Sequence, residues 1–379
     1  MSQERFDHYA RMRANAPVHF NPQLQLWEVY RYADIQTVLG DPHTYSSDAS
    51  VLQTMATMDP PRHTQLRRLV ARAFSAKLIA DLEPRIVSIV DGLLDRARQR
   101  GALDVVNDLA FPLPVTVIAE LLGLPVEDQL KFKAWSIPAV KAAEAELHGM
   151  PVPPEQLAAV AELEAYLLQM ANARKADPRA DLVSGLVHAE IDGQRLTDEE
   201  IVSTCRLLLI AGFETSANLI GNTLHLLLLH PEVLARVREQ PAQIDAVIEE
   251  ALRLHTPFQF LARKTLREVE LAGQQIPQGQ LVLLMLGSGN RDETAFERAD
   301  EFDPWRPPVR HLSFGHGIHY CLGAGLGRME ARIAVTRLLA QFQGLRLNES
   351  SPPVPLQSVV LFGLQHLPVQ WDHAIVKAA

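Results

Sequence analysis

A dense group of metal-binding residue types lies near the C-terminal end of the chain. Residues 311–325 read HLSFGHGIHYCLGAG, in which His316, His319 and Cys321 lie close together between glycines. Imidazole and thiolate groups at this spacing would suit a zinc or a blue-copper ion, although such an ion needs further ligands from elsewhere in the chain. A free cysteine buried in the core beside surface histidines is the alternative interpretation.

The glycines in this segment favour a ligand over a plain core cysteine. Gly315 and Gly317 allow the backbone to turn tightly and to approach a flat ligand closely. Cys321 stands at the start of the predicted helix LGAGLGRMEARIAVTRLLAQF, where backbone N–H groups and the helix dipole favour a thiolate. We therefore predict a preformed thiolate at Cys321, which suits iron.

A second group of polar residues interrupts a long apolar segment at 211–215, which reads AGFET. The Thr215 hydroxyl is placed to bond the Ala211 carbonyl four residues back and to open the helix locally, while Gly212 leaves room beside the helix. Burying the Glu214 carboxylate would cost free energy, so a buried glutamate at this position would indicate a functional role. The alternative is a capped polar defect in a helix.

Pairs of charged residues form a third signal. Glu250 and Arg253 are three apart, which by itself usually means an exposed ion pair worth a few tenths of a kcal/mol. His63 and Arg67 are four apart and therefore share one helix face. Because charged residues are mostly exposed, a surface location is the competing interpretation for each of them.

The segment FGHGIHYCLG at 314–323 resembles the haem-binding loop of the cytochrome P450 family, the haem-thiolate monooxygenases. The segment 211–215 resembles that family's oxygen-activating segment. Glu250-x-x-Arg253 followed by FDPWR at 302–306 is similar to its Glu-Arg-Arg network. The resemblance to soluble bacterial members runs from about residue 6 to the C-terminus, with one departure at Gly327, where alanine is more usual.

This resemblance implies a single catalytic domain over residues 1–379 with haem b, iron protoporphyrin IX, between a long central helix and the Cys-loop helix. Cys321 would be the axial iron ligand, whose electron donation favours O–O cleavage. The implied haem-binding residues are Cys321, His63, Arg67, Arg263, His319, Phe314, Gly315 and Gly323, the catalytic residues are Ala211, Gly212, Glu214 and Thr215, and the structural network is Glu250, Arg253 and Arg306. The implied substrate pocket comprises Leu208, Phe258, Phe260, Leu261, Val360, Leu361 and Phe362, together with Ala211, residues 52–57 and the Pro151 region.

The elements that must position these residues are mostly helices. Apolar residues recur at spacings of three and four over several stretches, and the longest is 197–230, where Thr197 is the predicted N-cap. Strand-like alternation is sparse, so we expect a mainly α fold with small β-sheets. The other predicted helices cover 34–39, 63–74, 79–98, 109–122, 127–147, 154–176 and 243–254, and the predicted strands cover 26–30, 261–271, 281–286 and 359–369.

Composition limits the function classes. The 379 residues carry 36 Lys and Arg against 45 Asp and Glu, a net charge of −9, which argues against nucleic acid or an anionic membrane as the main partner. Cys205 and Cys321 are the only cysteines, which excludes a disulfide framework, and Cys205 is expected in the core. The N-terminus lacks a signal-peptide pattern and no stretch suits a membrane span, so we expect a cytoplasmic protein with no fused reductase.

The leading hypothesis is a monooxygenase that inserts one oxygen atom of O2 into a small apolar substrate by hydroxylation or epoxidation. Electrons would come from a separate ferredoxin-type donor and its reductase. The alternatives are a peroxide-driven peroxygenase, against which Glu214 and Thr215 argue, and a non-enzymatic haem-binding sensor. The sequence indicates a class of substrate and not a compound. A basic docking face for the ferredoxin is expected from Arg62, Arg67, Arg68, Arg72, Arg306 and Arg310.

Overall fold

The structure is a computed structural model that describes residues 3–49, 54–74, 76–147, 151–191, 193–308 and 310–374. Helices dominate these residues, as predicted. The α-helices are α1 (Gln3–Asn15), α2 (Tyr32–Gly40), α3 (Arg62–Ala73), α4 (Ala76–Arg100), α5 (Pro112–Leu122), α6 (Gln129–Leu147), α7 (Pro154–Ala176), α8 (Leu182–Val187), α9 (Asp198–Leu229), α10 (Pro231–Glu239), α11 (Ile244–Leu254), α12 (Leu286–Gly289) and α13 (Ala324–Gln341).

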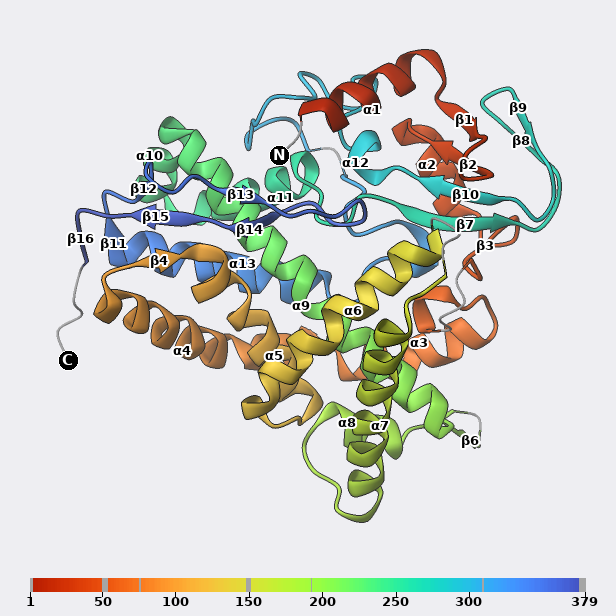
Figure 1. Cartoon of the computed structure of the whole chain (residues 1–379), viewed down its shortest axis with the longest axis horizontal. Coiled ribbons are helices and arrows are strands. Elements are labelled where there is room, and N and C mark those ends of the chain that lie inside the picture. Colours follow the sequence, from red (N-terminus) through yellow and green to blue (C-terminus); the bar gives the residue numbers. More distant parts are fainter. Residues whose placement is uncertain are drawn as a thin grey trace.

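Helix α9 crosses the middle of the molecule (Figure 1) and is 32 residues long. Its start follows the prediction, because the Thr197 side chain accepts from the Glu200 N–H while the Glu200 side chain accepts from the Thr197 N–H. Most side chains in its second half are buried, and α9 packs against α5, α7, α11 and α13. The predicted interior helix is confirmed.

The helix predicted over 109–122 is divided in the structure. A turn of π-helix, η2 (Val106–Ala110), precedes α5, which begins at Pro112. Proline has no N–H to continue the preceding turn but suits the first position of a new helix. Helices α1, α8, α10 and α12 lie outside the predicted ranges, because they are short or carry too many polar residues to show a clear apolar period.

The largest sheet has five strands in the order β1 (Val18–Asn21), β2 (Leu26–Val29), β10 (Leu281–Leu284), β7 (Leu261–Thr265) and β3 (Tyr45–Ser46). Strands β2 and β10 pair in parallel, and the other neighbours are antiparallel. The stretch predicted as one strand over 261–271 forms two, because the chain leaves this sheet after β7 and enters a hairpin with β8 (Val269–Leu271) and β9 (Gln274–Ile276).

Short two-residue and three-residue strands form the remaining sheets. One sheet has the order β12 (Arg346–Leu347), β15 (Pro368–Gln370) and β4 (Leu103–Asp104). The pairs are β5 (Glu190–Ile191) with β6 (Gln194–Arg195), β11 (Phe342–Gln343) with β16 (His373–Ala374), and β13 (Val354–Pro355) with β14 (Leu364–His366).

The main apolar core lies among the helices, where residues of α4, α5, α9, α11 and α13 pack together. A second cluster lies on the five-stranded sheet and is closed by α2 and Leu312. Figure 1 shows the sheet gathered on one side of α9, with α4 and α5 away from it. Within the residues described, no helix is both long and apolar enough to cross a membrane. Cys205 is buried in the main core, as predicted, and its burial raises the pKa of its thiol to about 12.

Candidate functional site

Cys321 lies in a tight loop between η5 (Gly317–His319) and α13. Gly315 and Gly317 have φ of +71° and +70°, so both adopt the left-handed conformation that glycine permits. A Cβ atom at Gly317 would lie 2.6 Å from the Leu39 carbonyl oxygen, so no other residue fits there. The Cys321 N–H donates to the Phe314 carbonyl at 2.8 Å, which closes the loop. The sequence-based prediction of tight glycine turns is confirmed.

The thiol of Cys321 differs from the prediction in its protonation. Burial raises its pKa above the usual range, while N–H groups of Gly323 and Ala324 and the cations Arg67 and Arg328 oppose this by lowering it. Part of the residue nevertheless reaches the surface. The prediction of a preformed thiolate is therefore wrong for the polypeptide alone, because desolvation outweighs the helix start; a bound metal would deprotonate the thiol.

Four hydrogen-bond donors from three separate segments meet beside this loop. The rings of His63, on α3, and His319 lie with their centroids 4.0 Å apart. Arg67, one turn after His63, donates to the carbonyl oxygen of Tyr320, next to the cysteine. Arg263 comes from β7, and burial lowers its pKa to about 10. The structure thus brings together the four residues that were predicted as one group.

These donors are poorly satisfied by the protein. Both ring nitrogens of His63 and Nε2 of His319 are buried and have no hydrogen-bond partner. Among the described residues, none of the four donors forms an ion pair with a carboxylate, and Arg263, with 6% exposure, donates only to the Ala262 carbonyl at 2.8 Å. Unpartnered buried donors are costly, so the arrangement suits an anionic ligand such as a carboxylate.

The segment 211–215 lies in the middle of α9. The Thr215 hydroxyl donates to the Ala211 carbonyl at 2.8 Å, as predicted, but the helix continues through this segment without a break. A Cβ atom at Gly212 would lie 3.3 Å from Cγ1 of Ile118 on α5, so this glycine allows two helices to pack and leaves no free space on that side. Glu214 is half-buried, not buried as expected.

The network of Glu250, Arg253 and Arg306 is formed as predicted. Arg253 donates to both oxygens of Glu250 at 2.8 Å, and Arg306 Nε donates to the same oxygens at 3.0 and 3.1 Å. Arg253 also donates to carbonyl oxygens of 290, 299 and 301. Glu250 and Arg253 are buried at 4% and 2% exposure, so this is an interior network that fixes the segment before the Cys321 loop.

The predicted substrate-pocket residues belong to three different packing clusters. Phe258 bridges to Leu361 and belongs with Phe260 and Val360 to a cluster against β2 and β10. Leu208 packs against the main core, and Leu261 packs against the second cluster near Gly315. Residues 52 and 53 of the predicted stretch 52–57 lie outside the described residues, whereas Met55 is buried and Pro151 is exposed.

Phe362 is a correction to this predicted pocket. Its ring lies 5.4 Å from that of Phe6 on α1 and 5.0 Å from that of His255, with Arg5 over its face. The side chain therefore holds α1 against the end of α11. Only its neighbours Val360 and Leu361 remain as pocket candidates from this segment.

The predicted basic face is smaller than expected. Arg62 pairs with Glu200 at the start of α9, and Arg306 is held in the Glu250 network, so neither is available to a partner. Arg68 and Arg72 are exposed on α3 and form no ion pair within the part of the chain that is described. Arg310 is likewise exposed and forms no ion pair among the described residues, whereas Arg67 donates to the Tyr320 carbonyl. Arg68, Arg72 and Arg310 therefore carry what remains of the prediction.

Glu330 is a functional candidate that the sequence analysis missed. It lies on α13 with 1% exposure, and its side chain is hydrogen-bonded to Ser216, the residue after Thr215 on α9. Burial raises its pKa to about 8, which the Ser216 bond opposes. Gly327 faces the same residue, and a Cβ atom there would lie 3.4 Å from Ser216 Oγ, an ordinary van der Waals contact. The signal was available, because apolar residues surround Glu330 at spacings of three and four.

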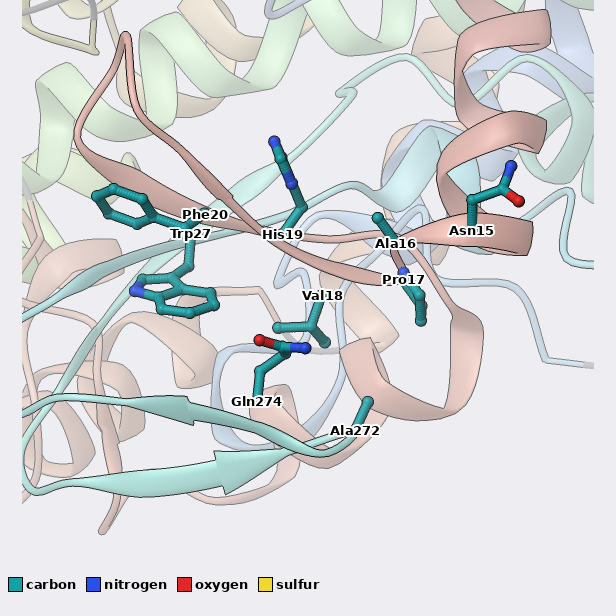
Figure 2. Close-up of a pocket in the computed structure, with 9 residues that line it drawn as sticks. All are labelled: Asn15, Ala16, Pro17, Val18, His19, Phe20, Trp27, Ala272 and Gln274. Atoms are coloured by element: carbon teal, nitrogen blue, oxygen red, sulfur yellow. The ribbon is translucent and has the colours of Figure 1, made fainter.

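A separate surface pocket of about 310 Å³ lies elsewhere, between the end of α1, β1, β2 and the β8–β9 hairpin. Figure 2 shows Phe20 and Trp27 side by side at one end, with Gln274 below Val18 and Ala272 further along the hairpin, toward Pro17. It shares no residue with the Cys321 loop or with 211–215. His19 is its only titratable lining residue, so it offers no evident catalytic group.

Comparisons with known proteins identify relatives along nearly the whole chain. A family model described as Cytochrome P450 matches residues 155–373. The chain is 40% identical over 369 residues to the erythromycin C-12 hydroxylase of Saccharopolyspora erythraea, which covers 94% of this chain and 92% of that protein. The chain belongs to the cytochrome P450 family. It is also 40% identical over 355 residues to the cyclomarin C epoxidase CymV of Salinispora arenicola, which covers 90% of this chain and 89% of that protein.

Solved P450 structures share the fold. The crystal structure of CYP109E1 from Bacillus megaterium in complex with testosterone is 36% identical, with a TM-score of 0.88, and covers 97% of this chain and 99% of that one. The predicted P450 fold is confirmed. The protein is a P450 monooxygenase with haem b as its cofactor, and the unpartnered donors beside Cys321 fit the two carboxylates of that group.

Proposed function

We propose that this chain forms one catalytic domain that inserts an oxygen atom of O2 into a small apolar substrate, by hydroxylation or epoxidation. The observation that carries this proposal is the meeting of Cys321, His63, His319 and Arg263, in which a thiol lies beside buried donors that lack partners. When bound, haem would supply the redox chemistry that activates dioxygen.

Within this proposal, each residue has a role that follows from its chemistry. Cys321 supplies a sulfur ligand to the iron, and Phe314, Gly315 and Gly323 keep the loop backbone in position for it. His63, Arg67, Arg263 and His319 donate to the propionates. This satisfies ring nitrogens and a buried guanidinium that otherwise have no anionic partner.

On the α9 side, Ala211, Gly212, Glu214 and Thr215 form the proposed oxygen-activating segment. The Thr215 hydroxyl donates its one proton to the Ala211 carbonyl, so its oxygen accepts a further hydrogen bond while that contact holds, and it passes a proton only when the bond to Ala211 opens. The half-buried Glu214 carboxylate exchanges protons with solvent more readily than a fully buried group.

The substrate class is supported by the apolar character of the remaining pocket candidates. Leu208, Phe258, Phe260, Leu261, Val360 and Leu361 carry no charge, and such surfaces select apolar ligands. The names of the relatives agree, because they refer to erythromycin, cyclomarin C and testosterone. We therefore propose a largely apolar small-molecule metabolite as substrate.

The decisive test is the ferrous–CO spectrum of the purified holoprotein. The wild type should give the strongly red-shifted Soret band of a thiolate adduct, and Cys321→Ala should lose it completely. Cys205→Ala is the matched control, because it removes the only other cysteine and should keep the band. Retention of the band in Cys321→Ala would overturn the assignment.

We also propose that electrons arrive from a ferredoxin-type donor, with its reductase, at the exposed Arg68 and Arg72 on α3. Arg68 directly follows Arg67, which contacts the Cys321 loop, and Arg72 lies five residues beyond Arg67, so an acidic partner there would be close to the thiolate. The charge attraction should weaken as salt is added.

The test reverses the charge of both residues. Arg68→Glu with Arg72→Glu should slow reduction by ferredoxin at low salt about tenfold and leave peroxide-driven turnover unchanged. Arg11→Glu with Arg96→Glu is the control, because it makes the same charge change at exposed positions of α1 and α4. Equal reduction rates for the two double variants would exclude this docking face.

A further inference from the structure

Arg328 lies on α13, one helical turn after Gly325, and reaches back over the Cys321 loop. Its guanidinium carbon lies 4.4 Å from the centre of the Phe314 ring, which is a cation–π contact. Nη1 lies 3.5 Å from the hydroxyl of Tyr320, the residue before Cys321. A positive charge is thereby placed against both sides of the loop that carries the thiol.

Glu249, on α11, holds this guanidinium with two hydrogen bonds. Arg328 Nε donates to one carboxylate oxygen at 2.6 Å and Nη2 donates to the other at 2.9 Å. Burial alone would raise the pKa of Glu249, but the hydrogen bonds from Arg328 and His311 outweigh it and bring that pKa to about 2. The carboxylate is therefore ionised throughout the physiological range.

His311 completes the arrangement from the start of the loop. Its Nδ1 accepts the Ser313 N–H at 3.2 Å, so Nε2 carries the proton of the neutral ring and donates to Glu249 at 3.2 Å. His311 is 8% exposed and its ring lies 5.7 Å from that of Phe314. We refer to His311, Glu249 and Arg328 as the triad; it joins α11, the loop and α13.

The triad differs from an ordinary pair on the same helix. Arg332, one turn further along α13, meets Glu83 at 3.1 Å through one contact, although these side chains are about as exposed (36% and 44%) as those of Arg328 and Glu249 (34% and 44%). Such a pair contributes little and leaves both charges free to move. In the triad, two hydrogen bonds, a ring face and a buried histidine restrict the guanidinium to one place.

We propose that the triad sets the reduction potential of the haem iron, with Arg328 raising that potential and Glu249 limiting the rise. The reason is electrostatic: reduction adds one negative charge to the centre, and a nearby cation favours that state while an anion opposes it. Arg328 contacts Phe314 and Tyr320 of the loop that carries Cys321, so its charge lies close to the proposed iron ligand. The inference rests on the proposed role of Cys321 as iron ligand.

The test is a spectroelectrochemical titration of the holoprotein at fixed pH and ionic strength. Arg328→Gln should lower the midpoint potential, and Glu249→Gln should raise it, since a glutamine carbonyl still accepts from Arg328 but carries no charge. At a given applied potential, each shift should change the ratio of reduced to oxidised haem about threefold. This is the size of effect expected when one charge is removed at a partly exposed site. Arg328→Lys should restore a potential near that of the wild type.

Arg332→Gln and Glu83→Gln are the controls and should leave the potential unchanged. Loosening of the loop alone would move both triad variants in the same direction, so shifts of equal sign, or none beyond the controls, would overturn the inference. A wild type without the thiolate ferrous–CO band would overturn the proposed function as well, whereas a normal band with no shifts overturns only the triad.

Discussion

The two sides of the candidate site are held by different kinds of contact. On the Cys321 side, side chains from distant segments are hydrogen-bonded to one another and to loop carbonyls. Asn290, for example, donates to Thr256 at 2.7 Å and Ser313 at 2.8 Å and accepts the Leu312 N–H at 2.7 Å. On the α9 side, the Thr215 hydroxyl bonds within its own helix, at Ala211.

The difference shows which parts of the site are fixed and which are left adjustable. A loop has no internal ladder of hydrogen bonds, so its position must be set by buried networks with other elements. A long helix satisfies its own backbone and holds its polar side chains with few outside contacts. The following predictions test this contrast, from the largest expected effect to the smallest.

The largest effect is expected on the Cys321 side from Arg253→Ala. This change leaves the buried Glu250 carboxylate with Arg306 and the Asp303 N–H and removes the donor to three loop carbonyls, so it should destabilise the fold by about 3–5 kcal/mol. Urea denaturation measures it. Arg298→Ala, which removes exposed ion pairs in the same region, should cost under about 1 kcal/mol. Equal losses would contradict the contrast.

The second prediction concerns Glu330, where the two sides meet. Its folded pKa of about 8 exceeds the ordinary 4.5, so between these values the folded protein holds a proton that the unfolded chain has lost. Stability should therefore fall as pH rises from about 4.5 to 8, by up to about 1.4 kcal/mol per pH unit. Glu330→Gln keeps a hydrogen-bonding group without this titration.

At pH 7 the glutamine variant should be more stable than the wild type by about 3 kcal/mol, and the gap should close toward pH 4.5. Thermal unfolding across this range measures the gap. Glu83→Gln, at a half-exposed position, is the control and should run parallel to the wild type. A constant offset for Glu330→Gln would mean that this carboxyl titrates normally.

The third prediction is for Asn290→Ala, which removes one member of the loop network. Asn290 has no exposed surface, so the Leu312 N–H and the Thr256 and Ser313 hydroxyls lose a buried partner at a cost of about 2 kcal/mol. Asn15→Ala removes an exposed bond to the Arg11 carbonyl and should cost far less. Similar unfolding midpoints for the two variants would show that the loop does not depend on Asn290.

The smallest stability effect is expected for Thr215→Ala, at about 0.5–1 kcal/mol, since one half-buried hydrogen bond is lost. Its functional effect should be larger, with reducing equivalents diverted to peroxide as product falls. Thr223→Ala is a close control, because Thr223 makes the same bond to a carbonyl four residues back in the same helix. Unchanged coupling of electron use to product in Thr215→Ala would refute the proposed role.

Features that depend on local spacing were predictable. The positive φ values at Gly315 and Gly317, the capping box that starts α9 and the bond from Thr215 to Ala211 each involve residues a few positions apart. Their geometry is set by backbone sterics and helix periodicity, which the sequence contains directly. The ion pair of Glu250 with Arg253 is local in the same way.

Features that depend on which residues of other elements pack against a side chain were not predictable from the sequence. The space beside Gly212 is occupied by Ile118 of α5. The ring of Phe362 packs on Phe6 of α1. A period of three or four identifies a buried face without identifying its neighbour. The apolar neighbours of Glu330 indicate its burial, but the same limit hid its partner, because Ser216 lies on another helix.

The sequence by itself determined the family, the mainly helical architecture and the position of the Cys321 loop, because these follow from motifs and periods along the chain. The tertiary structure decided the charge of Cys321, the burial of Arg263 and the pairing of Arg328 with Glu249. Desolvation and Coulomb energies depend on which atoms surround a group in space, and those atoms come from segments far apart in the sequence.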